Sequence, residues 1–247
     1  HGHPSGGRCR TGALERPMTT GKGRARSSGD RQRPSTKAGR STSSQRWLQR
    51  QFRDPYVADA KAQGYRSRAA FKLAEIDDKF HLLTPGKRVL DLGAAPGGWT
   101  QVAVERVGEG KGAVYAADIL EMDPVGGAAF AQLDIDDQKS VNALRTLMGA
   151  PVDVVLSDMA QPTTGHAATD HLRIMGLAET AYAFAAEVLL PGGSFVCKLF
   201  QGGAERTLLE TLKRDFAKVR HAKPPASRAD SSETYLVATG FRRPAGD

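Results

Sequence analysis

The sequence predicts an α/β fold in which a mostly parallel sheet is covered by helices on both faces. From residue 88 onward, short apolar runs alternate with segments whose apolar residues recur at helical spacing, and this alternation is typical of βαβ units. The chain has 247 residues and is 40% hydrophobic, enough for one domain with a sizeable core. Its apolar stretches are interrupted within about ten residues, short of the roughly 20 that span a bilayer, so we expect a soluble protein.

The individual elements follow from these runs. The apolar runs predict strands at 88–93, 113–118, 130–134, 152–157, 193–199 and 234–240. Helical spacing predicts helices at 98–107, 137–148, 170–190 and 203–216. An earlier helix has four apolar residues on one face: Ala69, Leu73, Ile76 and Phe80. Ser67 is a suitable N-cap for it. Ligands of such sheets bind beyond the carboxyl ends of the strands, so the residues that follow each strand are candidates for a site.

Positive charge is concentrated at the start of the chain. Residues 1–45 contain ten Lys and Arg against two acids, whereas the other 202 residues contain 25 of each sign. We expect 1–45 to be a disordered basic tail and 46–247 to be a single domain. The tail is either a solubilising extension or an arm that attracts nucleic-acid phosphates. It lacks the amphipathic face of a transit peptide, and Met18 is a suitable natural start, which would make 1–17 a leader.

The stretch DLGAAPGGWT at 91–100 joins the first strand to a helix through a glycine-rich turn. Small residues there let the backbone approach a ligand closely. The spacing departs from the dinucleotide pattern G-x-G-x-x-G, and no Lys-Ser/Thr pair of a P-loop follows. The turn therefore indicates a nucleotide-like cofactor without identifying it.

Two acids after the next strands narrow the choice of cofactor. Asp118 lies twenty residues after Gly98, the distance at which an acid accepts hydrogen bonds from ribose hydroxyls. Asp134 follows the third strand and could meet the amino edge of an adenine. A nucleoside read by two carboxylates, without a pyrophosphate cradle, favours S-adenosylmethionine over NAD. The alternative is that both acids only cap turns.

Five motifs stand in order along the chain: YRSRAAFKL, DLGAAPGGWTQ, VLSDMA, FVCKLFQG and SSETYLVATGF. Together they resemble the motifs of the FtsJ-type ribosomal RNA 2′-O-methyltransferases, specifically the bacterial members that modify a uridine of 23S rRNA. The resemblance runs from about Ser44 to Phe241 and leaves the tail uncovered. It implies a Rossmann-like, S-adenosylmethionine-dependent methyltransferase with a seven-stranded sheet.

The family carries a Lys-Asp-Lys-Glu tetrad, which the motifs place on Lys72, Asp158, Lys198 and Glu233. Methyl transfer to a ribose 2′-hydroxyl is an in-line displacement in which the oxygen loses a proton. Lys198 can take that proton only when neutral, a form that a neighbouring Lys72 would favour. The two carboxylates favour the charged form, in which Lys198 would act by positioning and electrostatics. Taken singly, each of the four residues could equally have a structural role, at a strand end, as a cap or in a surface ion pair.

For the cofactor we expect contacts from Gly97, Trp99, Asp118 and Asp134, with Asp158 touching the methionine part. A core aromatic is the alternative for Trp99. No metal is expected, because the histidines show no ligand spacing and no phosphoryl charge develops in this displacement.

The segment before the first helix mixes basic and aromatic side chains, as in proteins that bind unpaired RNA. Its basic residues are Arg46, Arg50, Arg53, Lys61, Arg66 and Arg68, interleaved with Trp47, Phe52, Tyr56 and Tyr65. The alternative is that the aromatics anchor this segment to the domain. The long loop at 160–170 is a candidate lid over the target nucleotide.

The resemblance implies 23S rRNA in the assembled large ribosomal subunit as the substrate. Transfer RNA or an mRNA cap is an alternative acceptor, and a non-catalytic RNA-binding assembly factor is a further one, disfavoured by the intact tetrad. Two cysteines give no disulfide framework, so a reducing compartment such as the cytoplasm is expected. We expect a monomer with no membrane partner.

Overall fold

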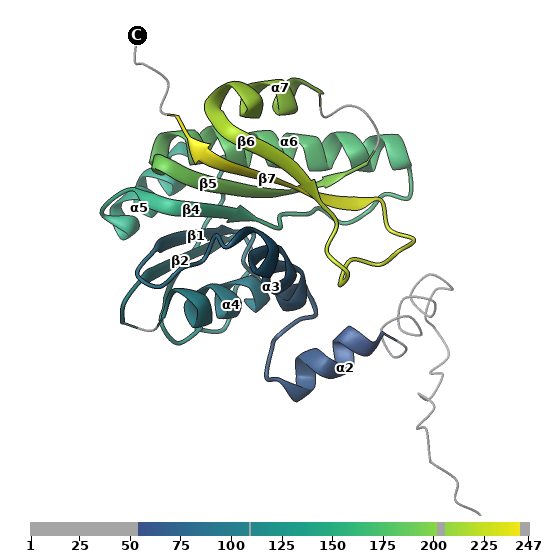
Figure 1. Ribbon diagram of the computed structural model, residues 1–247, viewed down its shortest axis with the longest axis horizontal. Helices are drawn as coiled ribbons and strands as arrows, with labels where there is room; N and C mark the ends of the chain where they lie inside the picture. The colour runs from purple at the N-terminus through teal and green to yellow at the C-terminus, as the bar shows by residue number, and fades with distance from the viewer. Residues whose placement is uncertain (1–53, 109, 202–205, 243–247) are drawn as a thin grey trace, which may run out of the picture. The chain divides into compact units, whose positions relative to one another are not determined.

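The computed structural model describes residues 54–108, 110–201 and 206–242, which form one twisted sheet between two layers of helices (Figure 1). The strands are β1 (Arg88–Leu92), β2 (Ala113–Asp118), β3 (Ala128–Gln132), β4 (Val152–Ser157), β5 (Leu189–Phe200), β6 (Phe216–Ala222) and β7 (Glu233–Phe241). The helices are α2 (Pro55–Ala62), α3 (Ala69–Phe80), α4 (Gly98–Val107), α5 (Gln138–Met148), α6 (Ala167–Val188) and α7 (Arg206–Asp215). The predicted tail at 1–45 lies outside the described residues.

The strand order is β3-β2-β1-β4-β5-β7-β6. Neighbouring strands from β3 to β5 run parallel, whereas β7 runs antiparallel to both β5 and β6. The predicted fold class, a mostly parallel seven-stranded sheet with helices on both faces, is therefore confirmed. The strand order reverses between β1 and β4, and ligands of open α/β sheets bind at such a switch point.

Alternating side chains of the strands build two cores, one on each face of the sheet. In β1, Leu90 and Leu92 belong to the core that includes residues of α5, α6 and α7, whereas Val89 belongs to the core that includes residues of α3 and α4. Successive residues of a strand point to opposite faces, and both faces are covered here. The central strands therefore read as nearly continuous apolar runs, which is why the sequence reveals them clearly.

The strands β2 and β4 and the helix α4 have the predicted bounds, the other predicted elements differ from the prediction at one or both ends, and α2 and β6 were not predicted. No strand was predicted at β6, whose sequence FAKVRHA is buried at its two ends and mostly exposed between them. β6 lies at the edge of the sheet and pairs only with β7 among the described strands. An edge strand with one exposed face lacks the apolar run by which the other strands were found.

The predicted N-cap at Ser67 is wrong. Helix α3 begins at Ala69 with Arg68 at the cap position, and no side chain caps it. The Ser67 carbonyl accepts the Ala70 amide at 3.2 Å, and its buried hydroxyl has no hydrogen-bond partner among the described residues. Helix α6 begins at Ala167, three residues earlier than predicted. Within the described ranges, no helix is both long and apolar enough to cross a membrane.

Candidate active site

A cavity of about 350 Å³ lies beyond the carboxyl ends of β1, β2 and β4. Its lining residues come from these strands, from the segments after β2, β3 and β4, and from α6: Leu92, Gly93, Ala95, Ala117, Asp118, Ile119, Leu120, Leu133, Asp134, Ile135, Asp136, Asp158, Met159, Ala160, Gln161 and Leu177. Its volume is typical of small-molecule sites, which occur at this switch point in α/β sheets. We call it the donor cavity.

Asp118 lies at the end of β2 and ties two walls of the donor cavity together. One carboxylate oxygen accepts the Ala95 amide at 2.8 Å, and the other accepts the Leu120 amide at 2.8 Å. Ala95 belongs to the glycine turn and Leu120 to the segment after β2. Asp118 therefore caps turns, as the alternative interpretation held, and it also lines the cavity.

Asp134 lines the donor cavity from the segment after β3. One of its oxygens accepts the Asp136 amide at 3.0 Å. The apolar side chains of Ile119 and Leu120 are 63% and 61% exposed beside it. Ligand cavities are lined mainly by apolar side chains, so these two residues can cover an apolar part of a ligand. The sequence analysis overlooked these two residues, although both directly follow the second strand and its Asp118.

Gly97 and Trp99 are not among the residues that line the donor cavity. The Trp99 indole N–H donates to the Ala69 carbonyl at 2.8 Å, and its ring packs against Tyr235 with centroids 5.6 Å apart. The ring is buried in the core under α3 and α4, as the alternative interpretation held. The first amides of α4, before that of Gln101, lack an intrahelical acceptor and are candidates to meet a ligand. A cofactor contact by Gly97 or Trp99 stays a prediction.

The four tetrad residues form two ion pairs at the ends of α3, β4, β5 and β7. The Lys198 ammonium donates to the Asp158 carboxylate at 3.0 Å and to its carbonyl at 2.7 Å. The Lys72 ammonium lies 2.6 Å from the Glu233 carboxylate. Antiparallel pairing of β5 with β7 places Phe200 opposite Glu233, two residues beyond Lys198. All four side chains are mostly buried.

Tyr235 joins the two pairs, a residue that the sequence analysis did not single out. Its hydroxyl donates to the Asp158 carboxylate at 2.8 Å, and the Lys72 ammonium lies 5.9 Å from its ring centroid. Burial, Asp158 and Glu233 raise the pKa of Tyr235 well above its usual value, so it remains a donor. Tyr235 lies directly opposite Lys198 in the β5–β7 pairing, a register that no local sequence pattern reveals.

The charge state of Asp158 is fixed by its neighbours. Burial raises the pKa of this carboxyl, but the ammonium groups of Lys198 and Lys72 outweigh that effect and hold the pKa below its usual value. The hydrogen bond from Tyr235 acts in the same direction. Asp158 is therefore an ionised acceptor at neutral pH.

A second cavity, of about 230 Å³, adjoins the Lys72–Glu233 pair. It is lined by Arg68, Lys72, Arg228, Asp230, Ser231 and Glu233, and we call it the acceptor cavity. Asp158 of the other pair lines the donor cavity. The two linked ion pairs therefore lie between a largely apolar cavity with carboxylates and a cavity lined by charged and polar groups.

The family model for FtsJ-like methyltransferases matches residues 65–241, which include both cavities and both ion pairs. This chain belongs to the FtsJ-like methyltransferase family. The family assignment that the motifs predicted is confirmed.

Two relatives in the FtsJ-like family are similar over most of their length. The ribosomal RNA large subunit methyltransferase E of Paramagnetospirillum magneticum is 62% identical over 207 residues, which cover 82% of this chain and 85% of that protein. The protein of the same name from Bradyrhizobium diazoefficiens is 62% identical over 205 residues, covering 82% and 90%. A crystal structure of a candidate ribosomal RNA methyltransferase from Plasmodium falciparum superposes with a TM-score of 0.65 at 34% identity, covering 72% of this chain and 98% of that one.

In this FtsJ-like chain, the two described aromatics of the basic segment serve as anchors. The Tyr56 hydroxyl donates to Glu75 at 3.2 Å and the Tyr65 hydroxyl to Glu105 at 2.7 Å, while both rings pack on Phe71. This favours the anchoring alternative for these two. The other predicted RNA-binding residues of the segment, except Lys61, Arg66 and Arg68, lie outside the described residues: Arg46, Trp47, Arg50, Phe52 and Arg53.

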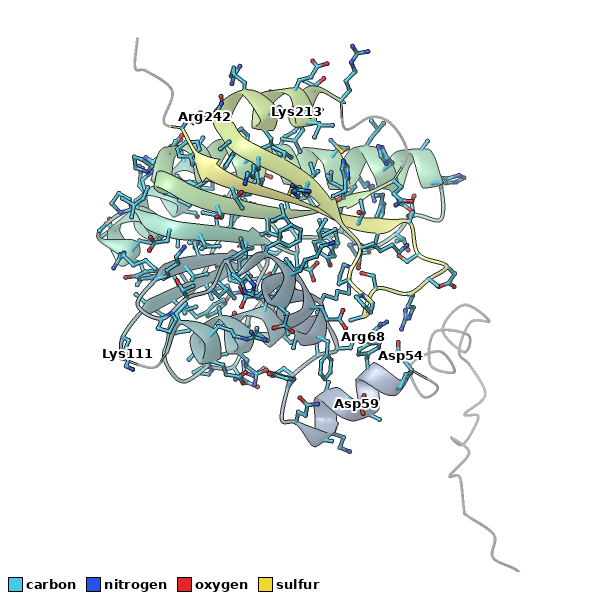
Figure 2. The ribbon with its side chains drawn as sticks, viewed as in Figure 1. Asp54, Asp59, Arg68, Lys111, Lys213 and Arg242 are labelled. Atoms are coloured by element: carbon cyan, nitrogen blue, oxygen red, sulfur yellow. The ribbon has the colours of Figure 1, made fainter. Side chains whose placement is uncertain are left out.

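Arg68 joins α2, α3 and the β6–β7 loop at the acceptor cavity. Its guanidinium pairs with Asp54 at 2.7 Å, the N-cap of α2, and also donates to the Ala226 carbonyl. Figure 2 labels Asp54 and Arg68, whose side chains point toward each other. The Arg228 guanidinium binds the same Asp54 oxygen at 3.1 Å. One carboxylate thus holds two guanidinium groups at the edge of the cavity.

Among the described residues, no group of three His, Cys, Asp or Glu side chains could hold a metal ion. The segment before α6 contributes Ala160 and Gln161 to the donor cavity. The rest of the proposed lid, up to His166, is exposed. Its role as a lid stays a prediction.

Proposed function

We propose that this chain is an S-adenosylmethionine-dependent methyltransferase that modifies the 2′-hydroxyl of a uridine in 23S rRNA, on the assembled large ribosomal subunit. The observation that carries the proposal is the placement of the two linked ion pairs between the donor and acceptor cavities. The family and the names of the 62% identical relatives support the ribosomal substrate. With a ribosomal substrate, we expect the activity in the cytoplasm.

The donor cavity fits an adenosyl group carrying a methionine. Asp118 and Asp134 provide acceptors for hydroxyl and amino groups, and the exposed side chains of Ile119 and Leu120 provide apolar cover for a base. Asp158 stands at the side of the cavity next to Lys198, where it can meet the methionine end. The bound donor supplies an electrophilic methyl group on a sulfonium.

Lys198 is the group that we expect to meet the acceptor hydroxyl. A neutral amine has two N–H donors and one lone pair, whereas an ammonium has three donors. The two contacts of Lys198 Nζ, to the carbonyl and carboxylate of Asp158, use two donors. The remaining position is a lone pair that accepts the hydroxyl proton or an N–H that orients the oxygen. Both mechanisms of the sequence analysis fit this geometry.

Lys72 and Glu233, which form one of the two ion pairs, line the acceptor cavity. The pair is held by Ser227, whose hydroxyl donates to Glu233 at 2.9 Å. Its position suits a role in orienting the ribose, since the hydroxyl must lie in line with the bond that breaks. Arg68 and Arg228 line the same cavity. The terminal nitrogens of Arg68 already bind Asp54 and the Ala226 carbonyl, so we expect Arg228 to meet a flanking phosphate.

The experiment that tests the proposal is transfer of labelled methyl from S-adenosylmethionine to large subunits, naked rRNA and tRNA in parallel, followed by mapping of the modified nucleotide. We expect a ribose-methylated uridine of 23S rRNA, with large subunits as the best substrate. Transfer to tRNA alone, or to a base instead of a ribose, would overturn the proposal.

The role of Lys198 is tested by Lys198→Ala. This variant should bind S-adenosylhomocysteine as the wild type does and lose methyl transfer by at least about a hundredfold, the usual scale for a group that handles the proton. A rate near that of the wild type would exclude both mechanisms. In the wild type, a rise of the rate with pH through a single ionisation favours the neutral base, and its absence favours the charged positioning group.

A further inference from the structure

We infer that Arg66 is a positioning residue for the methyl donor, because it fixes the distance between two walls of the donor cavity. The inference rests on the proposed function, which assigns that cavity to S-adenosylmethionine. Arg66 was predicted to bind RNA, but the contacts of its side chain indicate a different role.

The Arg66 guanidinium binds three backbone carbonyls from two separate loops. Nη1 donates to the Pro96 carbonyl at 3.2 Å and to the Asp123 carbonyl at 2.5 Å, while Nη2 donates to the Pro124 carbonyl at 2.6 Å. Pro96 belongs to the glycine turn after β1, and Asp123 and Pro124 belong to the loop between β2 and β3. One side chain therefore joins these two loops.

The same two loops each form part of the wall of the donor cavity. Gly93 and Ala95 line it from the glycine turn, and Ile119 and Leu120 line it from the loop after β2. Asp118 ties these walls at the strand end through the Ala95 and Leu120 amides. Arg66 joins the same two loops a few residues further along each, at Pro96 and at Asp123 and Pro124. The spacing of the walls is therefore fixed at two places.

Gly97 shows that the turn is built around this guanidinium. The residue has φ of 110°, and a Cβ added there would lie 2.9 Å from Arg66 Nη1 and 3.1 Å from Met122 Sδ. Both distances are shorter than ordinary contacts of a carbon atom, so a side chain at 97 would displace the guanidinium. The glycine in the family motif therefore has a packing reason that involves Arg66.

Arg66 itself is held in register by α4. Its backbone N–H donates to Gln101 Oε1 at 2.9 Å, and Gln101 Nε2 donates to the Gly64 carbonyl at 3.0 Å. A planar guanidinium can serve several carbonyls at fixed angles, whereas a lysine ammonium on its flexible stem holds fewer at once. The three carbonyls occupy the terminal nitrogens that a phosphate would need, which is why we favour positioning over RNA contact.

The test compares Arg66→Gln and Arg66→Lys with the wild type in the full-length protein. Arg66→Gln should weaken S-adenosylhomocysteine binding, measured by calorimetry, by about tenfold, because hydrogen bonds to a charged donor are lost. The KM for S-adenosylmethionine should rise by a similar factor, whereas kcat and the KM for large subunits should change by less than about twofold. Arg66→Lys keeps the charge and the aliphatic stem, and it should fall between the two.

Lys61→Gln is the matched control, since it removes one positive charge from an exposed position in the last turn of α2. It should leave the S-adenosylhomocysteine affinity unchanged. If Arg66→Gln, or Arg66→Lys where the glutamine variant does not fold, raises the KM for large subunits but leaves S-adenosylhomocysteine binding intact, the inference is overturned and Arg66 is an RNA contact. If the wild type itself fails to bind S-adenosylhomocysteine, the proposed function fails instead.

Discussion

Asp158 receives donors from two strands, and this makes Tyr235 part of the site. The Lys198 ammonium and the Tyr235 hydroxyl both donate to the same carboxylate oxygen, at 3.0 and 2.8 Å. A neutral donor to the same oxygen helps to fix the orientation of the carboxylate without adding charge. The position of Lys198 therefore depends on a residue that does not itself face the donor cavity.

Tyr235→Phe should lower kcat by about tenfold, because Asp158 loses the hydrogen bond that orients it toward Lys198. Loss of one buried hydrogen bond to a charged acceptor should reduce the free energy of unfolding by about 1–2 kcal/mol. Steady-state kinetics and urea unfolding measure the two effects. An unchanged kcat together with lower stability would show that Tyr235 is only a core residue.

Asp91 is a fully buried carboxyl in β1, bound by the Thr100 hydroxyl at 2.7 Å. Burial raises the pKa of Asp91 to about 7, and the nearby Asp158 and Asp118 add to the effect of burial. The folded protein therefore keeps this proton up to about pH 7, whereas the unfolded chain releases it near the usual pKa of about 3.9. Folding takes up a proton between these values, so stability should fall as the pH rises through that window.

Asp91→Asn should remove this pH dependence, since asparagine can still accept from Thr100 and has no proton to lose. The stability of the variant relative to the wild type should increase with pH between about 4 and 7, by up to about 1.4 kcal/mol per pH unit, and then level off. Urea unfolding at pH 5, 6, 7 and 8 measures this. A difference that is the same at every pH would show that Asp91 is ionised in the folded protein.

At the scale of elements, the sequence predicted the central sheet well and its edge poorly. Strands buried on both faces form unbroken apolar runs, so β2 and β4 have the predicted bounds, whereas β6 at the edge shows no such run. Ser67 resembles an N-cap locally, but tertiary packing buries its hydroxyl beside α4: a Cβ added at Gly98 would lie 2.5 Å from Ser67 Oγ.

The same contrast holds in the candidate site. Each of the four tetrad residues lies in a motif of its own, so the sequence predicted all four, and the fold brings them together. Tyr235 contacts Asp158, which lies 77 positions away in the sequence. Arg66 contacts the two loops, whose residues lie 30 to 58 positions away. Such contacts depend on how β7 pairs with β5 and how α3 packs on α4, and no local pattern encodes them.

The segment before α6 is held by Asp170. Its carboxylate accepts the Thr164 amide and hydroxyl, both at 2.7 Å, and the Gly165 amide at 3.3 Å. These hydrogen bonds lower the pKa of Asp170, so the acceptor stays ionised at neutral pH. The segment is therefore fastened to the first turn of α6, while Ala160 and Gln161 at its other end line the donor cavity.

Asp170→Ala should release the segment and, if it acts as a lid, lower kcat/KM for large subunits by about three- to tenfold, the range expected when a gating loop loses its closed form. Amide hydrogen exchange should increase at 160–166 and remain unchanged in β1 and β4. Deletion of 163–167 gives the stronger version of the test. Unimpaired turnover on large subunits after either change would exclude the lid.

At the scale of the whole molecule, charge is unevenly distributed along the chain. Residues 1–45 carry ten basic against two acidic side chains, whereas residues 46–247 carry equal numbers of both. The domain that holds both cavities is therefore neutral in sum, although Arg68 and Arg228 place positive charge at the acceptor cavity. We therefore expect the tail to supply most of the long-range attraction to a polyanion such as rRNA, because it carries all of the excess positive charge.

We propose that residues 1–45 act as an electrostatic arm, and deletion of this segment tests it. At about 50 mM salt the shortened chain should show a KM for large subunits raised by about tenfold, because fewer counterions are released on binding. The slope of log KM against log salt concentration should be shallower than in the wild type, and the KM values of the two proteins should converge at high salt.

Binding of S-adenosylhomocysteine and kcat should be unchanged, since both depend on the cavities within the domain. Equal KM values at every salt concentration would instead favour the solubilising extension. A loss of kcat would show that the segment contributes to the site itself.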